Sequence, residues 1–593
     1  MAMNFDKINY AEKGIDWIHE KLNEKQFLIL SSILVGISAG IAAVILKLFV
    51  HVIRQYFMEN WLLRIDFKYI YLLMPMIGIG LTVLIVQRFF KGKLYRGNVN
   101  ILHAIAKKGS FLPFQQMYSH IITSGFTVAM GGSAGLESPI VSTGAAIGSN
   151  YSRRYKLNYK DRTLLLAAGA AGGIAGAFNS PIAGVLFALE VILVDITITA
   201  FIPLLIAAAS GALLSKILLD ESILLSFRLL QPFDYHNVPL YVLLGVLAGF
   251  TSLYYVNVFD FTESKFKKIK SKYGKWIIGS ILLALLFAFF PSLFGEGYES
   301  IKSLAEQKPT ALFKDSLIQN FISTRWLTFF FVSVALLLKA CAAGITIGSG
   351  GNGGNFAPAL FVGAYLGFVF SYLLILLGYD IPVSNFTIVA MAGILTGVFH
   401  APLTGIFLIA EITGGYELII PLMLVSSISY IIVKYFHPLS MDAKKLLKKG
   451  TIVSEDKDVT ILGKIDIDAI IENDFSVLHP NDTLRAIVET IKHSKRNTFP
   501  VISKTNKLLG VIQLDHIREE MFNQELYDKV IARELMYEAT TKIRISDNIF
   551  TIMKKFDESG QWNLPVVHNG TYVGFLSKSS ILTKYRNELV ASL

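Results

Sequence analysis

Cysteine and charge are both scarce in this chain of 593 residues, and each scarcity excludes a class of protein. The single cysteine, Cys341, cannot form an intramolecular disulfide or a metal site built from several cysteines. Charged residues make up 17% of the chain, whereas an ordinary soluble domain has roughly 25%. With 53% hydrophobic residues and a mean hydropathy of +0.52, the composition excludes a water-soluble enzyme over the whole length.

Positive charge exceeds negative charge. Lysine and arginine number 55 against 44 aspartate and glutamate, which gives a net charge of +11. In a chain this apolar, the surplus fits basic cytoplasmic segments beside membrane lipid rather than a nucleic-acid partner. Residues 1–26 mix acidic and basic side chains, so we expect a cytoplasmic surface helix there and no cleaved secretory signal.

Long stretches with little or no charge begin at residue 27. A membrane span needs about 20 apolar residues, and the candidates are residues 27–50 (where Lys47 is the single charge), 69–87, 163–189, 235–259, 277–295 and 359–379. The apolar stretches after Pro139, Pro181, Pro358 and Pro402 are short and bounded by glycine and proline. We expect broken half-helices there, which membranes tolerate where the freed backbone lines a cavity or packs on protein.

The apolar region repeats itself. Residues 178–190 (FNSPIAGVLFALE) recur 221 positions later as residues 399–411 (FHAPLTGIFLIAE), and residues 135–139 (GLESP) match residues 354–358 (GNFAP). Such halves often have inverted topology, with the substrate site at their interface near the midplane. We predict a membrane domain over residues 27–440 made of two inverted halves, about 27–220 and 237–440.

A soluble tail follows the last apolar stretch. Lysines cluster at positions 444, 445, 448 and 449, and positive-inside logic places them, like the basic loop 265–272, in the cytoplasm. After a linker at 441–454, an x-Pro-Val strand, a polar turn and a Gly-led strand occur twice, from Phe499 and from Leu564. We predict two α/β modules, residues 455–524 and 525–593.

Two glycine-rich breaks, residues 131–139 and 348–358, lead into helices. Glycine lets backbone N–H groups approach a ligand, and a helix N-terminus presents unpaired donors with roughly half a positive charge. Such a site can hold an anion without a full countercharge. Neither break has the Gly-Lys-Ser/Thr ending of a nucleotide P-loop. Glycine that only lets membrane helices pack closely is the alternative.

These motifs resemble those of the CLC family of chloride channels and chloride/proton antiporters. Residues 135–139 are similar to its Gly-Arg/Lys-Glu-Gly-Pro motif, and residues 354–358 fit its Gly-x-Phe-x-Pro motif. The resemblance covers nearly the whole chain from about residue 27, including a cytoplasmic pair of CBS modules. It implies an α-helical membrane protein built as an inverted repeat of two halves with broken helices, about eighteen helices in all, plus the α/β CBS pair. A homodimer with one pore per subunit is also implied.

The resemblance assigns roles to particular residues. Glu137 matches the external gating glutamate that competes with the anion and carries the proton; a carboxylate in an apolar membrane segment is functional by default. The motifs imply anion binding by Gly135, Leu136, Gly354, Asn355, Phe356 and Ala357, with the backbone N–H of Phe356 at the central site. Alternatively, Glu137 is a structural carboxyl that caps neighbouring helices, and Phe356 is an ordinary core phenylalanine.

The chain departs from the family at the inner side of the central site. The first family motif, Gly-Ser-Gly-Ile-Pro, aligns with residues 95–99 (YRGNV), which keeps Gly97 but puts Arg96 in place of the serine. The central tyrosine position aligns with Asp442. We hypothesise that Arg96, Gly97 and Asp442 form part of the anion site, with an Arg96–Asp442 ion pair replacing the two hydroxyls. Alternatively, Arg96 snorkels to the cytoplasmic surface and Asp442 starts a solvated helix.

A further departure concerns protons. Glu190 matches a glutamate found generally in the family, but Val191 stands where many antiporters carry an internal proton-transfer glutamate. Glu190 could take part in gating or proton transfer, or could equally be a satisfied structural carboxyl. Its repeat mate Glu411 and the buried-segment Lys339 are expected to be structural.

The CBS pair departs from nucleotide-binding relatives. The positions that would hold an adenosine nucleotide are Gln513 and His516 in the first module and Ser577 and Ser580 in the second, and both modules lack the ribose-binding aspartate. The pattern favours dimer stabilisation or gating contact over a bound nucleotide. No other cofactor and no metal site is expected.

The sequence thus predicts chloride transport across the inner membrane of a bacterium, with both termini cytoplasmic, by proton exchange gated at Glu137. A passive anion channel with the same pore is the first alternative, which Val191 favours. A CBS-regulated cation transporter is the second, although cation pathways need carboxylate clusters or carbonyl cages. We find no nucleophile–base pair that would indicate an enzyme.

Overall fold

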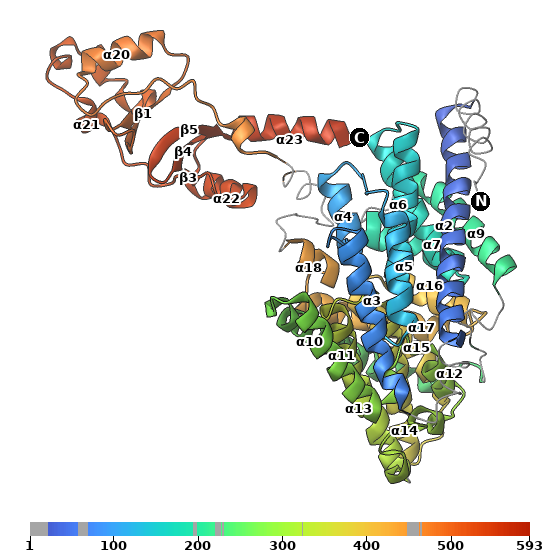
Figure 1. The fold of residues 1–593 in the computed structure, drawn as a ribbon. Coiled ribbons are helices and arrows are strands. Elements are labelled where there is room, and N and C mark those ends of the chain that lie inside the picture. The colour runs from blue at the N-terminus through green and yellow to red at the C-terminus, as the bar shows by residue number, and fades with distance from the viewer. Residues whose placement is uncertain are drawn as a thin grey trace. The chain divides into compact units, whose positions relative to one another are not determined.

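A computed structural model of the chain describes residues 22–56, 69–95, 97–193, 198–219, 227, 231–322, 324–447, 462 and 465–592. The chain divides into two compact units, Met1–Thr451 and Ile452–Leu593. The described part of the first unit is built from helices, and the second combines helices with two small sheets (Figure 1).

The helical unit contains two successive sets of helices. The first set comprises α2 (Glu24–Arg54), α3 (Met74–Phe89), α4 (Asn98–Lys107), α5 (Gln116–Ala129), α6 (Glu137–Arg154), α7 (Tyr159–Phe178), α8 (Pro181–Phe187), the π-helix η4 (Ala188–Leu193) and α9 (Ile198–Leu218). The second comprises α10 (Val238–Lys268), α11 (Lys272–Phe289), α12 (Tyr298–Ala305), α13 (Arg325–Gly348), α14 (Phe356–Leu376), α15 (Val383–Phe399), α16 (Pro402–Ile412), α17 (Ile419–Phe436) and α18 (Met441–Leu447). Short 3₁₀ turns connect them at Ile70–Leu73, Tyr235–Asn237, Pro291–Leu293, Pro309–Phe313 and Gln319–Phe321.

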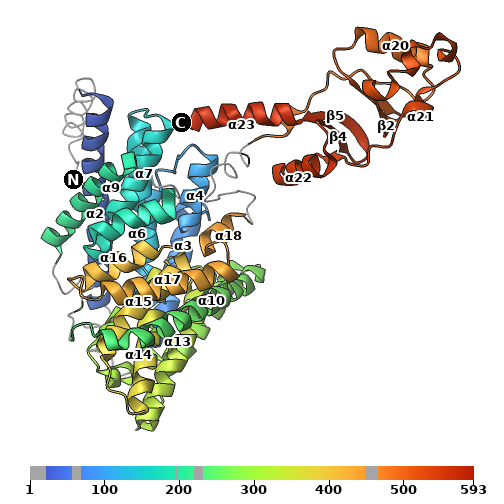
Figure 2. The same cartoon turned by 180° about the vertical axis from the view of Figure 1, so that it is seen from behind.

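The two sets pack in corresponding ways. Helices α2, α7 and α9 contact one another in the first set, and α10, α15 and α17 do so in the second (Figures 1 and 2). Likewise α6 packs on α7 as α14 packs on α15. The structural correspondence follows the sequence repeat.

Within the described residues, eight helices are long and apolar enough to cross a membrane, which agrees with most of the predicted spans. The stretch 163–189 is instead divided between α7 and α8. Asn179 ends α7 in the left-handed conformation (φ 55°), and Pro181 starts α8. His400 (φ 57°) and Pro402 repeat this break between α15 and α16. Proline lacks the N–H that would continue the first helix, so it starts the second.

The expectation of short half-helices holds for two of the four prolines. Helix α8 has 7 residues and α16 has 11. After Pro139 and Pro358 it is wrong, because α6 has 18 residues and α14 has 21. These two prolines lie in the first turn of their helices, where the missing N–H has no intrahelical partner to lose.

Glycines let α6 and α7 approach at backbone distance. A Cβ added to Gly144 would overlap the carbonyl group of Gly169, and one added to Gly148 would overlap that of Leu165. The equivalent positions on α14, Gly363 and Gly367, contact the α15 backbone in the same way. These are the small-xxx-small contacts by which helices pack closely in membranes, and they lie outside the two glycine-rich breaks.

We expect Gly148→Ala to destabilise the helical unit by about 1–3 kcal/mol, the usual cost of overpacking. The added methyl group forces α6 away from the Leu165 carbonyl. Thermal unfolding of the purified protein in detergent measures the effect. Gly415→Ala is the control, because no atom lies within 4 Å of its added Cβ; an equal loss in both variants would contradict close packing at Gly148.

The second unit contains two modules with similar order. The first has α20 (Leu484–His493), antiparallel strands β1 (Thr498–Ile502) and β2 (Leu508–Gln513), and α21 (Ala532–Leu535). The second has β3 (Ile543–Arg544), α22 (Ile549–Ser559), β4 (Asn563–His568), β5 (Thr571–Ser577) and α23 (Lys578–Ser592), with β3 parallel and β5 antiparallel to β4. Short 3₁₀ turns lie at Asp468–Ile470, Leu514–Ile517, Glu520–Phe522 and Gln524–Leu526. The x-Pro-Val strands predicted from Phe499 and Leu564 are therefore present as β1 and β4.

Candidate functional site

The two glycine-rich breaks pair with each other. The backbone N–H of Gly135 donates to the carbonyl of Gly354 (2.9 Å), and the N–H of Gly354 donates to the carbonyl of Gly135 (2.7 Å). This two-bond bridge joins the repeat-related segments directly before α6 and α14. The N–H groups of Gly135 and Gly354 are thus used in holding the breaks together, and donors to an anion must come from neighbouring residues.

Glu137 is the first residue of α6 and is only 3% exposed. The Tyr298 hydroxyl donates a hydrogen bond to its Oε1, and the backbone N–H of Ala357, in the first turn of α14, also interacts with its carboxylate. Among the described residues, Oε2 has no hydrogen-bond partner. The carboxylate therefore lies at the N-termini of two helices, where the dipoles favour negative charge.

The Phe356 ring belongs to an aromatic cluster. Its centroid lies 5.5 Å from Phe178, 5.4 Å from Phe399 and 6.2 Å from Phe187. Phe178 and Phe399 are repeat mates, so the two halves contribute equivalent rings on either side. The ring is 2% exposed, while its backbone N–H lies in the first turn of α14, where helices leave donors without intrahelical partners.

The start of α4 lies beside α18, as the alignment of the two family positions requires. The Asn98 side-chain amide donates to Asp442 Oδ2 at 3.1 Å. Gly97 precedes α4 with φ 71°, in the left-handed region that glycine adopts without strain. Arg96 lies outside the described residues, so the Arg96–Asp442 ion pair stays a prediction, whereas Asn98 is a partner of Asp442 that the sequence did not identify.

Asn355 connects this inner group to the two glycine-rich breaks. Its Oδ1 accepts a hydrogen bond from the Tyr255 hydroxyl at 3.3 Å, and its Nδ2 lies 3.7 Å from the Met441 sulfur. The Asn355 side chain is thereby committed to α10 and α18. Its role in anion binding, if exerted by side-chain atoms, would require these contacts to break.

Glu190 and Glu411 each cap the N-terminus of a short helix in the other half of the repeat. Glu190 accepts hydrogen bonds from the backbone N–H groups of Leu403 (3.0 Å) and Thr404 (2.8 Å) at the start of α16. Glu411 accepts from Ile182 (3.0 Å) and Ala183 (2.9 Å) at the start of α8. Both carboxylates satisfy helix N-terminal donors that would otherwise be unpaired. These contacts favour the structural alternative for Glu190.

We expect Glu190→Ala and Glu411→Ala to destabilise the protein by similar amounts, about 1–2 kcal/mol each, as N-cap losses do. Each change leaves two backbone donors without a partner. Thermal unfolding in detergent measures the loss. If Glu190→Ala leaves stability unchanged but lowers proton flux, Glu190 belongs to the proton route instead.

Three further groups surround Glu137 that sequence reasoning did not assign. Tyr298 begins α12, and Glu296 lies two residues before it. Lys47, on α2, interacts electrostatically with both Glu137 and Glu296. Lys47 carried a signal, because it is the single charge in the span 27–50. The sequence gives no sign that Glu296 and Tyr298 belong to this site, because they lie about 160 residues from Glu137.

The CBS positions are already engaged within the second unit. The Ser577 hydroxyl donates to Glu472 (2.7 Å) and accepts from the Ser580 backbone N–H (3.0 Å). The His516 ring packs edge-on against Tyr537 at 5.2 Å. These contacts give no support to a nucleotide site at the predicted positions. Among the described residues, no group of His, Cys, Asp and Glu could hold a metal ion.

The described residues combine eight helices able to cross a membrane with two paired glycine-rich breaks and the buried Glu137 carboxylate directly after one of them. This combination is typical of a membrane transport protein. Residues 78–434, more than half of the chain, match the family model described as voltage gated chloride channel. Residues 466–523 and 532–587 match CBS domains. The chain therefore belongs to the voltage gated chloride channel family and carries two CBS domains.

Named relatives agree. A putative chloride channel protein ClcB-like from Ralstonia nicotianae is 28% identical over 368 residues, which cover 61% of this chain and 81% of the relative. The voltage-gated ClC-type chloride channel ClcB of Escherichia coli O81 is 25% identical over 376 residues, covering 62% and 84%.

Solved structures share the fold. A slow cyanobacterial Cl⁻/H⁺ antiporter aligns with a TM-score of 0.60 and 20% identity over 72% of this chain and 98% of that one. A eukaryotic CLC transporter aligns with a TM-score of 0.60 and 18% identity over 93% and 97%. A CLC-type fluoride/proton antiporter has a TM-score of 0.57 and 22% identity over 70% and 97%.

These findings confirm the predicted family and the fold class with its C-terminal CBS pair. They also confirm that the chain is a transport protein rather than an enzyme. Anion transport is therefore its general activity, and the cation alternative is not supported.

Proposed function

We propose that this protein exchanges chloride for protons across a bacterial inner membrane, with Glu137 as the gate. The observation that carries the proposal is the position of the Glu137 carboxylate, which interacts with the first turn of α14 while it begins α6. Helix N-termini stabilise anions, so this carboxylate occupies a place that suits a chloride ion.

Competition between the carboxylate and chloride explains the gate. An ionised Glu137 is held by the helix N-termini and blocks the site. Protonation removes its charge and weakens that attraction, so the side chain can leave and an anion can take its place. Because the carboxyl group carries the proton as it moves, anion and proton movement are coupled.

The inner end of the site has its own chemistry. We propose that Asp442, with Arg96, takes the place of the family's tyrosine and serine. The Asn98 amide donates to Asp442 and supports a fixed carboxylate at this end. An ionised Asp442 would repel an anion, so a nearby positive charge on Arg96 would be needed for anion entry.

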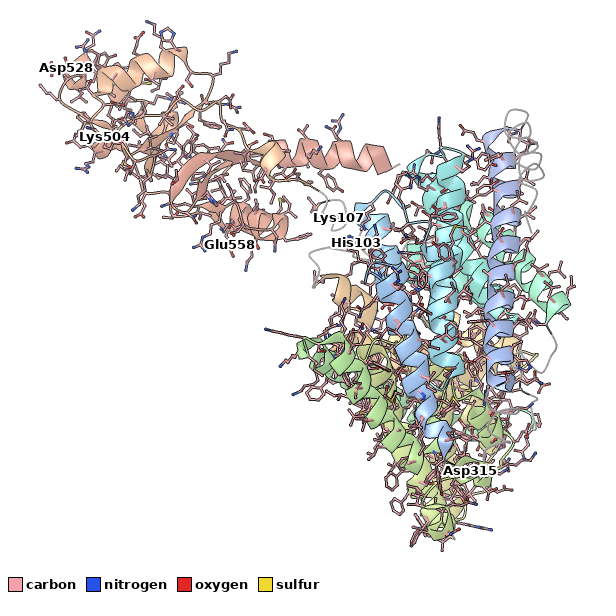
Figure 3. All side chains as sticks on the ribbon, viewed as in Figure 1. His103, Lys107, Asp315, Lys504, Asp528 and Glu558 are labelled. Carbon is pink, nitrogen blue, oxygen red and sulfur yellow. The ribbon has the colours of Figure 1, made fainter. Side chains whose placement is uncertain are left out.

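The distribution of charge indicates which end of the helical unit faces which side of the membrane. His103 and Lys107 lie at one end of the helical unit and Asp315 at the opposite end (Figure 3). Lys272 of the basic loop lies beside Gly92, shortly before α4. By the positive-inside rule we assign the Lys107 end to the cytoplasm. We also propose that both termini of the chain are cytoplasmic. A homodimer in lipid is the assembly that the resemblance implies.

Glu137→Gln should abolish proton movement and leave anion flux, because glutamine has the same shape but cannot take up a proton. Liposomes with a chloride gradient and simultaneous pH recording measure both fluxes. Glu299→Gln, a change at an exposed carboxylate, is the matched control. Proton movement that persists in Glu137→Gln would contradict the gate.

The passive channel is the second candidate, supported by Val191 and by the capping contacts of Glu190. Val191 cannot carry a proton, and the Glu190 carboxylate is occupied by its capping hydrogen bonds. Neither residue therefore provides an obvious internal proton-transfer group. The same recording distinguishes the candidates: chloride flux that drives no proton movement in the unmodified protein identifies a channel.

The Arg96–Asp442 pair can be tested by a double-mutant cycle in the same liposomes. We expect Arg96→Gln and Asp442→Asn to alter anion flux non-additively, with a coupling of about 0.5–3 kcal/mol, as for residues in direct contact. Independent effects would show that Arg96 does not face Asp442.

A further inference from the structure

A second carboxylate, Glu296, is built into the outer side of the gate. Its carboxylate interacts electrostatically with Glu137 and with the backbone N–H of Leu136, the residue directly before Glu137. The Gly295 N–H donates to the Gly131 carbonyl at 3.1 Å. This hydrogen bond ties the segment that carries Glu296 to the glycine-rich break that leads to Glu137.

Buried lysine contacts fix the same segment from behind. Lys339, on α13, is fully buried and donates to the carbonyls of Leu293 (3.3 Å) and Gly295 (3.0 Å). Its Nζ lies 4.6 Å from the centroid of the Phe361 ring. Because Lys339 holds the backbone on both sides of Phe294, the loop that carries Glu296 is fixed in place.

The charged and titratable groups around Glu296 come from four helices. Tyr298 and Glu299 belong to α12, Glu137 to α6 and Lys339 to α13, and Lys47 and Arg54 lie seven residues apart on α2. A spacing of seven places both α2 cations on one helix face. Arg54 is paired with Glu299 at 2.9 Å, which leaves Lys47 as the α2 cation shared by Glu296 and Glu137.

Exposure decreases stepwise along this group. The side chains of Glu299 and Arg54 are 79% and 47% exposed, Glu296 is half-buried, and Glu137 is 3% exposed. Helix α12 lies toward the end of the helical unit that carries Asp315 (Figures 1 and 3), the end we assign to the outside. Glu296 therefore lies between outer solvent and the gate.

We propose that Glu296 is the outer proton relay of the gate: it takes a proton from external water and passes it to Glu137, and accepts it back in the reverse direction. This inference rests on the proposed proton exchange. The transfer is balanced, because the O–H bond of protonated Glu296 breaks as an O–H bond forms on ionised Glu137. The Tyr298 hydroxyl, which donates to Glu137 Oε1, holds the acceptor in place.

The charges favour one shared proton. Two neighbouring carboxylates repel each other when both are ionised, so protonation of one favours ionisation of the other. Lys47 interacts with both carboxylates and stabilises whichever one is ionised. The proton can therefore move between them while the net charge of the pair stays the same, which keeps the cost of transfer low in a site of low dielectric.

Glu296→Gln is the decisive variant, assayed as the full-length protein in liposomes with chloride and pH recorded together. Glutamine keeps the shape of the side chain beside Leu136, but it cannot carry a proton. We expect unchanged anion flux and a proton flux lowered on the order of a hundredfold, as when a positioned proton-transfer group is lost. Glu296→Asp, which keeps a titratable group, should restore part of the proton flux.

Glu299→Gln is the matched control, because it removes a nearby outer carboxylate that is paired with Arg54; it should leave both fluxes unchanged. If Glu296→Gln couples as well as the unmodified protein, the relay is refuted and the exchange proposal stands. Equal loss of anion and proton flux in Glu296→Gln would also refute the relay. If the unmodified protein moves no protons, the exchange proposal itself fails, and the relay fails with it.

Discussion

Satisfaction of backbone hydrogen bonds at the broken helices is the constraint on which the rest of the helical unit depends. A break inside a membrane exposes N–H and carbonyl groups where water cannot pair with them. In this chain each half supplies the missing partners of the other, through the Gly135–Gly354 bridge and the exchanged caps of Glu190 and Glu411. The proposed ion site lies beside the Gly135–Gly354 bridge, so the same backbone pairing that closes the breaks also shapes that site.

Much of this could be predicted from the sequence, because its signals are local. The breaks follow from proline next to a left-handed residue, and the intramembrane carboxylate of Glu137 stands out against apolar neighbours. The missed residues are those whose roles depend on distant partners. The role of Asn98 depends on the packing of α4 against α18, and that of Tyr298 on the contact between α12 and the start of α6. Neither contact can be inferred from the sequence around these residues. The prediction of a short helix after Pro358 is wrong, because a proline in the first turn can start a long helix as well as interrupt one.

The inner and outer ends of the site use different chemistry. Beside Glu137, the described groups include one further carboxylate, Glu296, which interacts with Glu137 and with Lys47, Arg54 and Lys339. At the inner end, Asp442 stands at the position aligned with the family's tyrosine, and the Asn98 carboxamide, from the segment aligned with the first family motif, donates to it. A hydroxyl can donate to an anion, but an ionised carboxylate cannot. In the proposed anion site, the backbone donors of α14 and the Arg96 side chain therefore take over the stabilisation that the tyrosine and serine hydroxyls would supply.

The exchanged caps also set an order of assembly. Glu190 finds its partner N–H groups 213 and 214 residues later in the chain. At a synthesis rate of about 5–20 residues per second, roughly 10–40 s pass before α16 exists. During that interval the π-helix carries an unsatisfied carboxylate and α8 carries unsatisfied backbone donors. The first half therefore lacks these hydrogen-bond partners during its own insertion, until the second half has been made.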